Sequence, residues 1–349
     1  MSTRLFHPGL QTLVFAGIAT LQAIFPHPLK AQPYGAIDPV MGIYEGKWSA
    51  QDQHGTVKAQ IRPLGDSKYD GFIMIQSHGS NVTVLNLTGT SGGADAPLTM
   101  TASTITAKTD EVLSKASFKG EISLQRTAAN KLTGKLSGDL GEGELDAVRV
   151  TKKSPTLGAK APANAIVMFD GKTTNQWEDF HFLLNEDGSM QVQKGTMNSK
   201  PKLDNFKLHV EFRTPFMPQA QGQARGNSGV YLQSIYEVQV LDSFGLYPLQ
   251  INDCGSVYGI QRAKGNECYP PMEWQTYDIE YHQHDNTAQN PPEITIVHNG
   301  IPVIEKARVP EKLLGIGGGG GNPKGGFTML QDHGNPVQFR NIWVQPLSQ

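Results

Sequence analysis

A few polar residues near the ends of strand-like segments have side chains suited to acid–base chemistry. Glu237 and Gln239 alternate with apolar residues in the segment Tyr236–Leu241, and Asp242 follows directly. His333 lies in an Asp-His-Gly-Asn-Pro sequence that favours a turn. A carboxyl and an imidazole can exchange protons near neutral pH. We therefore predict Glu237 and His333 as an acid–base pair, with Asp242 and Gln239 in support, and leave open which member is the acid.

A second polar strand face occurs earlier in the chain. In Lys207–Arg213 the apolar residues occupy every second position, so Glu211 and Arg213 share the opposite face. If this strand neighbours Tyr236–Leu241, both residues contribute to one substrate-binding surface. The alternative is an ion pair between them, whereas Glu237 has no basic neighbour in its own segment.

Amides and aromatic rings in the same half of the chain have the chemistry for binding a sugar. Amides hydrogen-bond to hydroxyl groups, and aromatic rings stack on the apolar face of a sugar, although in a sandwich such rings also pack in the core. The candidate binding residues of these two kinds are Asn227, Gln331, Tyr231, Tyr258 and Trp274.

Strands must position these residues, and the composition favours strands. The 349 residues include 38 Gly and 22 Pro, and only 18% are charged. Short runs with period-two alternation are separated by Gly, Asp and Ser throughout the chain. We expect an all-β protein.

Two composition changes divide the chain. Residues 38–150 predict a small accessory domain, an antiparallel β-barrel or sandwich. Residues 151–164 carry Pro, Gly and Lys without apolar periodicity and predict a linker. Residues 165–349 carry the candidate site residues and predict a β-sandwich.

The N-terminus has the regions of a secretory signal peptide in their usual order: a basic residue, an apolar stretch and a small residue. We predict a signal peptide over residues 1–31. Arg4 precedes an apolar stretch, Leu10–Phe25, whose 16 residues are fewer than the about 20 that span a bilayer. We expect an exported protein, periplasmic or extracellular, with no stable membrane span after signal removal. The alternative is an uncleaved anchor.

The two cysteines, Cys254 and Cys268, are separated by a glycine-containing segment. In an oxidising compartment such a pair predicts a disulfide, and two thiols with no histidine nearby in sequence are too few for a structural zinc site. His282 and His284 have ligand-like spacing but are more typical of a solvent-facing strand end. We assign no cofactor and no metal ligand, while leaving room for a divalent ion elsewhere.

The charge balance excludes one class of partner. With 30 basic and 32 acidic residues the net charge is −2, whereas a nucleic-acid-binding protein carries a basic face. We expect no nucleic acid partner, and the oligomeric state is left open.

Eight segments follow one another in the C-terminal half: Ile166–Lys172, Leu208–Arg213, Asn227–Gln233, Tyr236–Asp242, Cys254–Gly259, Glu273–Tyr277, His298–Gly300 and Leu330–Ile342. In this order they resemble a known family, the 3-keto-disaccharide hydrolases, long catalogued as a domain of unknown function. The resemblance implies a concanavalin A-like lectin/glucanase sandwich, a jelly roll, that cleaves glycosides whose sugar carries a ketone at C3. The substrate would be an oxidised di- or oligosaccharide or glycoside.

A C3 ketone acidifies the hydrogen at C2, so the glycosidic bond can break by elimination, after which water adds to the enone. Such a site needs a base near C2 and an acid near the leaving oxygen. Three alternatives stay open: a non-catalytic, lectin-like protein on the same fold, an ordinary glycosidase with two carboxylates about 5–10 Å apart, and an interaction module.

Overall fold

The computed structural model describes residues 37–51, 53–77, 82–92, 98–104, 120–128, 130–285, 287, 289–309 and 326–348. The expected signal peptide, residues 1–31, lies outside these ranges. Apart from one short 3₁₀ helix, Gly222–Ala224, the regular elements there are strands, so the all-β class is confirmed. No helix in the described ranges has the length and apolarity needed to cross a membrane.

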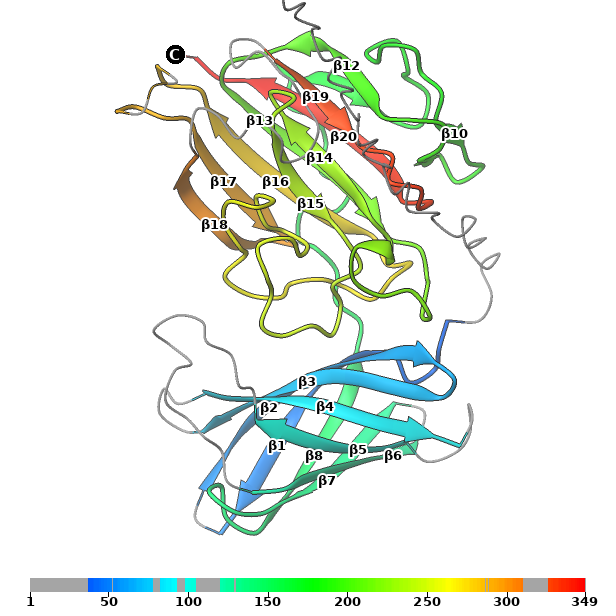
Figure 1. The fold of residues 1–349 in the computed structure, drawn as a ribbon, viewed down its shortest axis with the longest axis vertical. Helices are drawn as coiled ribbons and strands as arrows, with labels where there is room; N and C mark the ends of the chain where they lie inside the picture. Colours follow the sequence, from blue (N-terminus) through cyan, green and yellow to red (C-terminus); the bar gives the residue numbers. More distant parts are fainter. Residues whose placement is uncertain are drawn as a thin grey trace, which may run out of the picture. The chain divides into compact units, whose positions relative to one another are not determined.

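The first half of the chain forms a closed antiparallel barrel, which decides between the barrel and the sandwich that the sequence left open. Consecutive strands pair with one another, and β1 closes the barrel by pairing with β8 (Figure 1). The strands are β1 (Gly42–Ala50), β2 (Gln53–Gly65), β3 (Lys68–Ser77), β4 (Val82–Ser91), β5 (Leu98–Thr104), β6 (Ile122–Ala128), β7 (Lys131–Leu136) and β8 (Gly143–Val150).

Period-two alternation fills the barrel. Val57, Ala59 and Ile61 of β2 are buried together with Tyr44 and Trp48 of β1 in one hydrophobic cluster. Because every strand has two neighbours, closure leaves no unpaired edge. None of the expected site residues lies in this barrel.

The second half forms two sheets. The larger runs β10-β11-β20-β13-β16-β17-β18, with β9 also paired to β20, and the smaller runs β12-β19-β14-β15 (Figure 1). The larger sheet contains β9 (Ile166–Phe169), β10 (Leu183–Leu184), β11 (Met190–Gln191), β13 (Phe206–Arg213), β16 (Gln275–His282), β17 (Glu293–His298), β18 (Ile301–Arg308) and β20 (Gln338–Pro346). The smaller contains β12 (Met197–Lys202), β14 (Ser228–Leu232), β15 (Tyr236–Val240) and β19 (Phe327–Leu330).

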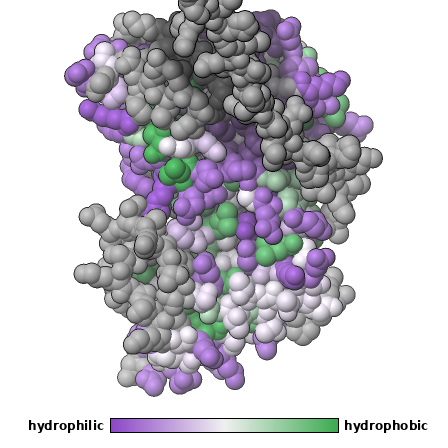
Figure 2. Space-filling model, in the orientation of Figure 1, coloured by the Kyte–Doolittle hydropathy of each residue, from purple (hydrophilic) through white to green (hydrophobic). Residues whose placement is uncertain are grey.

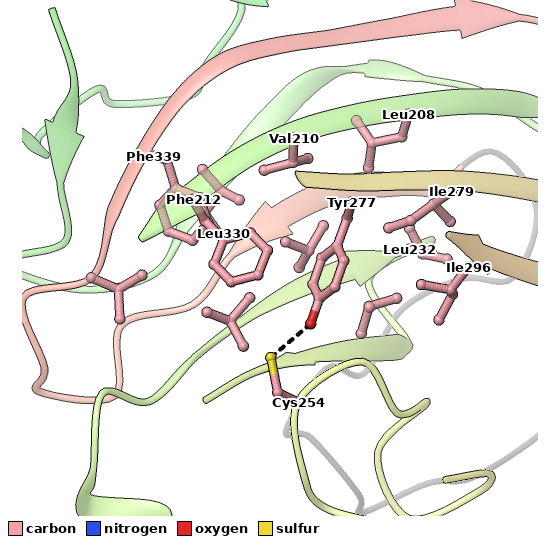
Figure 3. Close-up of a cluster of buried hydrophobic side chains, with 14 of the residues drawn as sticks. Leu208, Val210, Phe212, Leu232, Cys254, Tyr277, Ile279, Ile296, Leu330 and Phe339 are labelled. Carbon is pink, nitrogen blue, oxygen red and sulfur yellow. Dashed lines mark hydrogen bonds between the residues drawn. The ribbon is translucent and has the colours of Figure 1, made fainter. Parts of the chain in front are cut away.

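The two sheets share one hydrophobic core. Leu208 and Val210 of β13 belong to the same buried cluster as Leu232 of β14 and Leu330 of β19 (Figure 3). Since alternate residues of each strand enter this core, the other residues must lie on the outer faces of the sandwich. The chemistry predicted from the sequence is therefore divided between two outer faces.

The expected linker is attached to the sandwich rather than free. The Ser154 hydroxyl lies 2.6 Å from Thr276 Oγ1, and Thr156 Oγ1 donates to Asp278 Oδ2 at 2.6 Å. Farther along, the Ala159 carbonyl accepts hydrogen bonds from Asn341 and Trp343. This segment thus covers the outer face of β13, β16 and β20.

Exposed apolar side chains are dispersed. On the face shown in Figure 2, the hydrophobic residues that are coloured form small, separate patches among hydrophilic ones. Scattered apolar residues are normal on a protein surface and indicate no partner by themselves. The candidate functional groups of this protein are therefore its buried polar side chains.

Candidate active site on the smaller sheet

The β14–β15 hairpin displays a row of polar side chains on its outer face. Tyr231 of β14 pairs with Glu237 of β15, and Gly229 pairs with Gln239. The intervening Val238 faces the shared core and is fully buried. The alternation predicted for this segment is thereby confirmed, and it places Glu237 and Gln239 on one surface.

The carboxyl of Glu237 fills the space that a side chain at position 229 would occupy. A Cβ atom added at Gly229 would lie 2.5 Å from Glu237 Oε1 and 2.9 Å from its Cγ. Any other residue at position 229 would force the carboxyl to move. The glycine therefore sets the position of the carboxylate.

A hydrogen-bond chain holds the carboxyl from one side. The Tyr231 hydroxyl donates to Glu237 Oε2 at 2.8 Å and accepts from Gln331 Nε2 at 3.0 Å. Tyr258 lies alongside, because its backbone N–H donates to the Glu237 carbonyl. In the described part of the chain no hydrogen bond reaches Glu237 Oε1, so this oxygen is available for proton transfer.

Burial controls the proton affinity of Glu237. Desolvation raises its pKa from the ordinary 4.5 to about 7, and the hydrogen bond from Tyr231 only partly opposes this. No cation among the described residues forms an ion pair with it, and the side chain is 6% exposed. A carboxyl with a pKa near 7 can both accept and donate a proton at neutral pH.

Three buried amide oxygens beside this carboxyl lack hydrogen-bond donors. They are Asn227 Oδ1, Gln239 Oε1 and Gln331 Oε1. The Gln223 Oε1 atom accepts from the Nδ2 of Asn227 and the Nε2 of Gln239, which fixes the direction of both amides. Buried acceptors without donors are uncommon. They are therefore suited to bind hydroxyl groups of a ligand.

Asp242, which we expected to support catalysis, forms a buried ion pair with Arg225. Its Oδ2 lies 2.6 Å from Arg225 Nε, and both side chains are 1% exposed. The same guanidinium also donates to the carbonyls of Pro218 and Ala220. The second oxygen of Asp242, Oδ1, accepts the backbone N–H of Phe244 at 3.3 Å, so both carboxylate oxygens have partners within the protein.

Glu211 and Arg213 lie on the other sheet, so the expectation that their strand neighbours β15 was wrong. Strand β13 pairs with β16 and β20. Each of the two residues has a partner elsewhere: Glu211 Oε2 lies 2.7 Å from Arg340 Nε, and Arg213 Nη2 lies 2.8 Å from Asp187 Oδ2.

The environment of Glu211 makes it a permanent anion. Burial alone would raise its pKa, but hydrogen bonds from His209, Asn341, the Gly158 amide and Arg340 outweigh this and hold the pKa at about 2. This carboxylate is buried beneath the segment that follows the barrel, because Gly158 donates to its Oε1. The carboxylate thereby holds that segment against the larger sheet, and its substrate-binding role stays a prediction.

Trp274 packs against Arg213 and Arg340 rather than lying beside Glu237. The guanidinium carbons of Arg213 and Arg340 lie 4.5 and 4.0 Å from the centre of its ring. Such cation–π contacts occupy the ring surface that a sugar would need. In this arrangement the two arginines lie over the ring, so the stacking role of Trp274 stays a prediction that requires them to move aside.

His333 lies at the exposed end of a turn whose two flanks contact the site. Gln331 bonds to Tyr231, and Asn335 Oδ1 accepts the backbone N–H of Asn227 at 2.7 Å. No hydrogen bond or ion pair connects the His333 side chain with another described residue. The turn brings His333 near this part of the sheet, while its protonation role stays a prediction.

The expected disulfide is not formed in the structure. Cys254 and Cys268 are both free and buried. His282 pairs with Glu280, with Nε2 and Oε1 2.7 Å apart, and its ring stacks on that of His284, an arrangement that needs no metal. Within the described ranges, the one group of His, Cys, Asp and Glu side chains close enough to hold a metal ion is Cys254, Cys268 and His298.

Two contributors to the site were missed in the sequence. Gln223, in the short 3₁₀ helix, has no strand-like context to single it out. Gly229 stands in a recognisable Asn-Ser-Gly sequence, but only the cross-strand register shows that its missing side chain makes room for Glu237.

Residues 164–345, just over half of the chain, match the family model of the 3-keto-alpha-glucoside-1,2-lyase-like domain. Two crystal structures of presumed glycosyl hydrolases from Parabacteroides distasonis are also similar. One is 32% identical, has a TM-score of 0.49, and covers 54% of this chain and 85% of its own. The other is 18% identical, has a TM-score of 0.40, and covers 53% and 94%. No match was found among curated proteins.

Proposed function

Since the chain belongs to the 3-keto-alpha-glucoside-1,2-lyase-like domain family, we propose that it cleaves 3-keto-glycosides by elimination and subsequent hydration. The observation that carries the proposal is the Glu237 carboxyl, buried without a cation and with its pKa raised to about 7. We further propose that its sandwich is of the concanavalin A-like type and that the protein acts after export.

Glu237 is assigned the role of base. Its Oε1 atom takes the proton from C2, the electron pair of the C2–H bond forms the C1=C2 double bond, and the C1–O bond to the leaving group breaks. The leaving oxygen acquires a proton, for which His333 or water is the donor. Water then adds at C1 and a proton returns to C2, so that the net reaction is hydrolysis.

The remaining polar groups bind the sugar. The free oxygens of Asn227, Gln239 and Gln331 accept hydrogen bonds from its hydroxyls. The Tyr231 hydroxyl holds Glu237 Oε2 and keeps Oε1 directed at the substrate. An ordinary glycosidase mechanism needs a second carboxyl near the first, and the nearby Asp242 is engaged by Arg225.

The test compares p-nitrophenyl 3-keto-α-glucoside with p-nitrophenyl α-glucoside. We expect the wild-type protein to release p-nitrophenol only from the keto-sugar, and deuterium at C2 to slow the release. Glu237→Gln should lower kcat/KM by about 10²–10⁴-fold, the usual contribution of a positioned acid–base group. Glu178→Gln, at an exposed position, serves as the matched control.

Cleavage of both sugars at similar rates would contradict the elimination mechanism. Binding of either sugar without turnover, unchanged by Glu237→Gln, would support the lectin-like alternative instead.

A further inference from the structure

Two cysteines and a histidine from separate segments meet inside the sandwich. Cys254 and Cys268 lie in the long connection between β15 and β16, and His298 ends β17. Their ligand atoms all lie within 4.8 Å of one another. Each of the three side chains is at most 2% exposed, and Figure 3 shows Cys254 among the apolar side chains of the core.

The hydrogen bonds of His298 define which ring nitrogen carries the proton. Gln275 Oε1 accepts the backbone N–H of Tyr269 at 2.9 Å, so the atom of Gln275 at this position is the oxygen. The same oxygen lies 3.0 Å from His298 Nε2, which must therefore be the protonated nitrogen. The lone pair is then on Nδ1.

The unprotonated nitrogen faces the cysteine-bearing turn. A Cβ atom added at Gly255, the residue after Cys254, would lie 3.5 Å from His298 Nδ1. A metal-binding histidine usually donates its second N–H to a carbonyl or carboxylate, which orients the ring. Gln275 supplies this outer hydrogen bond. A disulfide between the two cysteines would make no use of an imidazole held in this way.

We propose that Cys254, Cys268 and His298 bind a structural Zn²⁺ ion. Thiolates and imidazole are the ligands that zinc prefers. Two thiolates neutralise the two charges of the ion while the imidazole stays neutral, so the complete site has no net charge. A neutral complex avoids the large cost of an unpaired charge in an apolar core.

Tyr277 is the group placed to complete the four ligands that a structural zinc ion takes. Its hydroxyl oxygen lies 3.0 Å from Cys254 Sγ (Figure 3). The same hydroxyl donates to the Gln239 carbonyl at 2.6 Å, which leaves a lone pair of the oxygen for the ion.

The zinc ion would stabilise the strand that carries the candidate active site. The backbone N–H of Gly255 donates to the Gln239 carbonyl, and the backbone N–H of Gln239 donates to the Ser256 carbonyl. Residues next to Cys254 therefore pair directly with β15. Joining this turn to Cys268 and His298 through one ion fixes the β15–β16 connection against β17.

The test measures zinc in the full-length protein, denatured under reducing conditions and refolded with ZnCl₂. We expect one zinc per chain after dialysis, and two thiols that react only when denaturant and a chelator are both present. In Cys268→Ser and His298→Gln the zinc content should fall at least tenfold. His54→Gln, at an exposed barrel position, should keep full occupancy.

A second measurement does not depend on the variants folding. Replacing zinc by Co²⁺ in the wild-type protein should give the thiolate-to-cobalt charge-transfer absorption and the intense visible bands of a tetrahedral site. A chelator should lower the melting temperature, and ZnCl₂ but not MgCl₂ should restore it.

Three outcomes would overturn the proposal: a refolded wild-type chain without stoichiometric zinc, zinc retained in both variants, or a metal-free chain whose two thiols have been consumed in a disulfide.

Discussion

Replacing Glu237 by Gln should stabilise the protein at alkaline pH while it lowers the proposed activity. The pKa of the buried carboxyl is raised from 4.5 to about 7, so the folded state prefers the protonated form. Below pH 4.5 this group does not destabilise the folded state. The stability that the protonated carboxyl contributes to the folded wild-type protein is lost as the pH rises through 7. Glutamine has nearly the same shape and no proton to lose.

The magnitude follows from the rise in pKa. At about 1.4 kcal/mol for each pH unit, a rise from 4.5 to about 7 corresponds to about 3 kcal/mol. Solvent screening reduces this little because Glu237 is only 6% exposed. The free energy of unfolding of Glu237→Gln minus that of the wild type should therefore increase by about 3 kcal/mol between pH 4.5 and pH 8.5.

Hydrogen exchange followed by mass spectrometry suits this measurement, because a barrel and a sandwich in one chain need not unfold as one two-state unit. Peptides covering residues 228–240 report on the β14–β15 hairpin directly. Comparing variant and wild type at the same pH cancels the intrinsic exchange rate and most other titrating groups. The exposed Glu178→Gln variant should show a pH-independent difference near zero.

A difference between Glu237→Gln and the wild type that stays constant over this pH range would refute the reasoning. It would mean that Glu237 ionises at its ordinary pKa, and the argument for its role as the base would fail with it.

Three further substitutions test neighbouring contacts. Gly229→Ala should displace the Glu237 carboxyl and so lower kcat, measured by keto-glycoside turnover. It should also lower the free energy of unfolding by about 1–3 kcal/mol, measured by hydrogen exchange. Tyr231→Phe removes the hydrogen bond that lowers the pKa of Glu237, so the limb of the kcat/KM profile that Glu237 controls should move to higher pH; an unchanged profile would exclude this coupling. Asp242→Asn leaves the buried Arg225 without its counter-charge and should cost about 3–5 kcal/mol, while wild-type stability would contradict the assigned structural role.

The strand patterns could be predicted because they depend on neighbouring residues alone. Alternating apolar residues identified the all-β class, and they placed Glu237 and Gln239 on one face of their strand. The absence of a basic neighbour in the same segment also singled out Glu237. The ordered segments of the C-terminal half identified the family.

Side-chain partners could not be predicted, because they depend on which strands become neighbours. Glu211 lies two residues from Arg213 in sequence but pairs with Arg340 across the register of β13 and β20. Asp242, a plausible catalytic carboxylate at a strand end, is neutralised by Arg225 from another loop. Local patterns carry no information about such long-range pairings.

The cysteines show the same division. From the local sequence, Cys254 and Cys268 were predicted to form a disulfide, because no histidine lies near them in the chain. Only the pairing of β16 with β17 brings Gln275 and His298 together beside the two thiols. Local alternation therefore determined the strands and their faces, whereas the long-range pairing of strands decided which polar groups are neutralised and which keep the protons and lone pairs needed for chemistry.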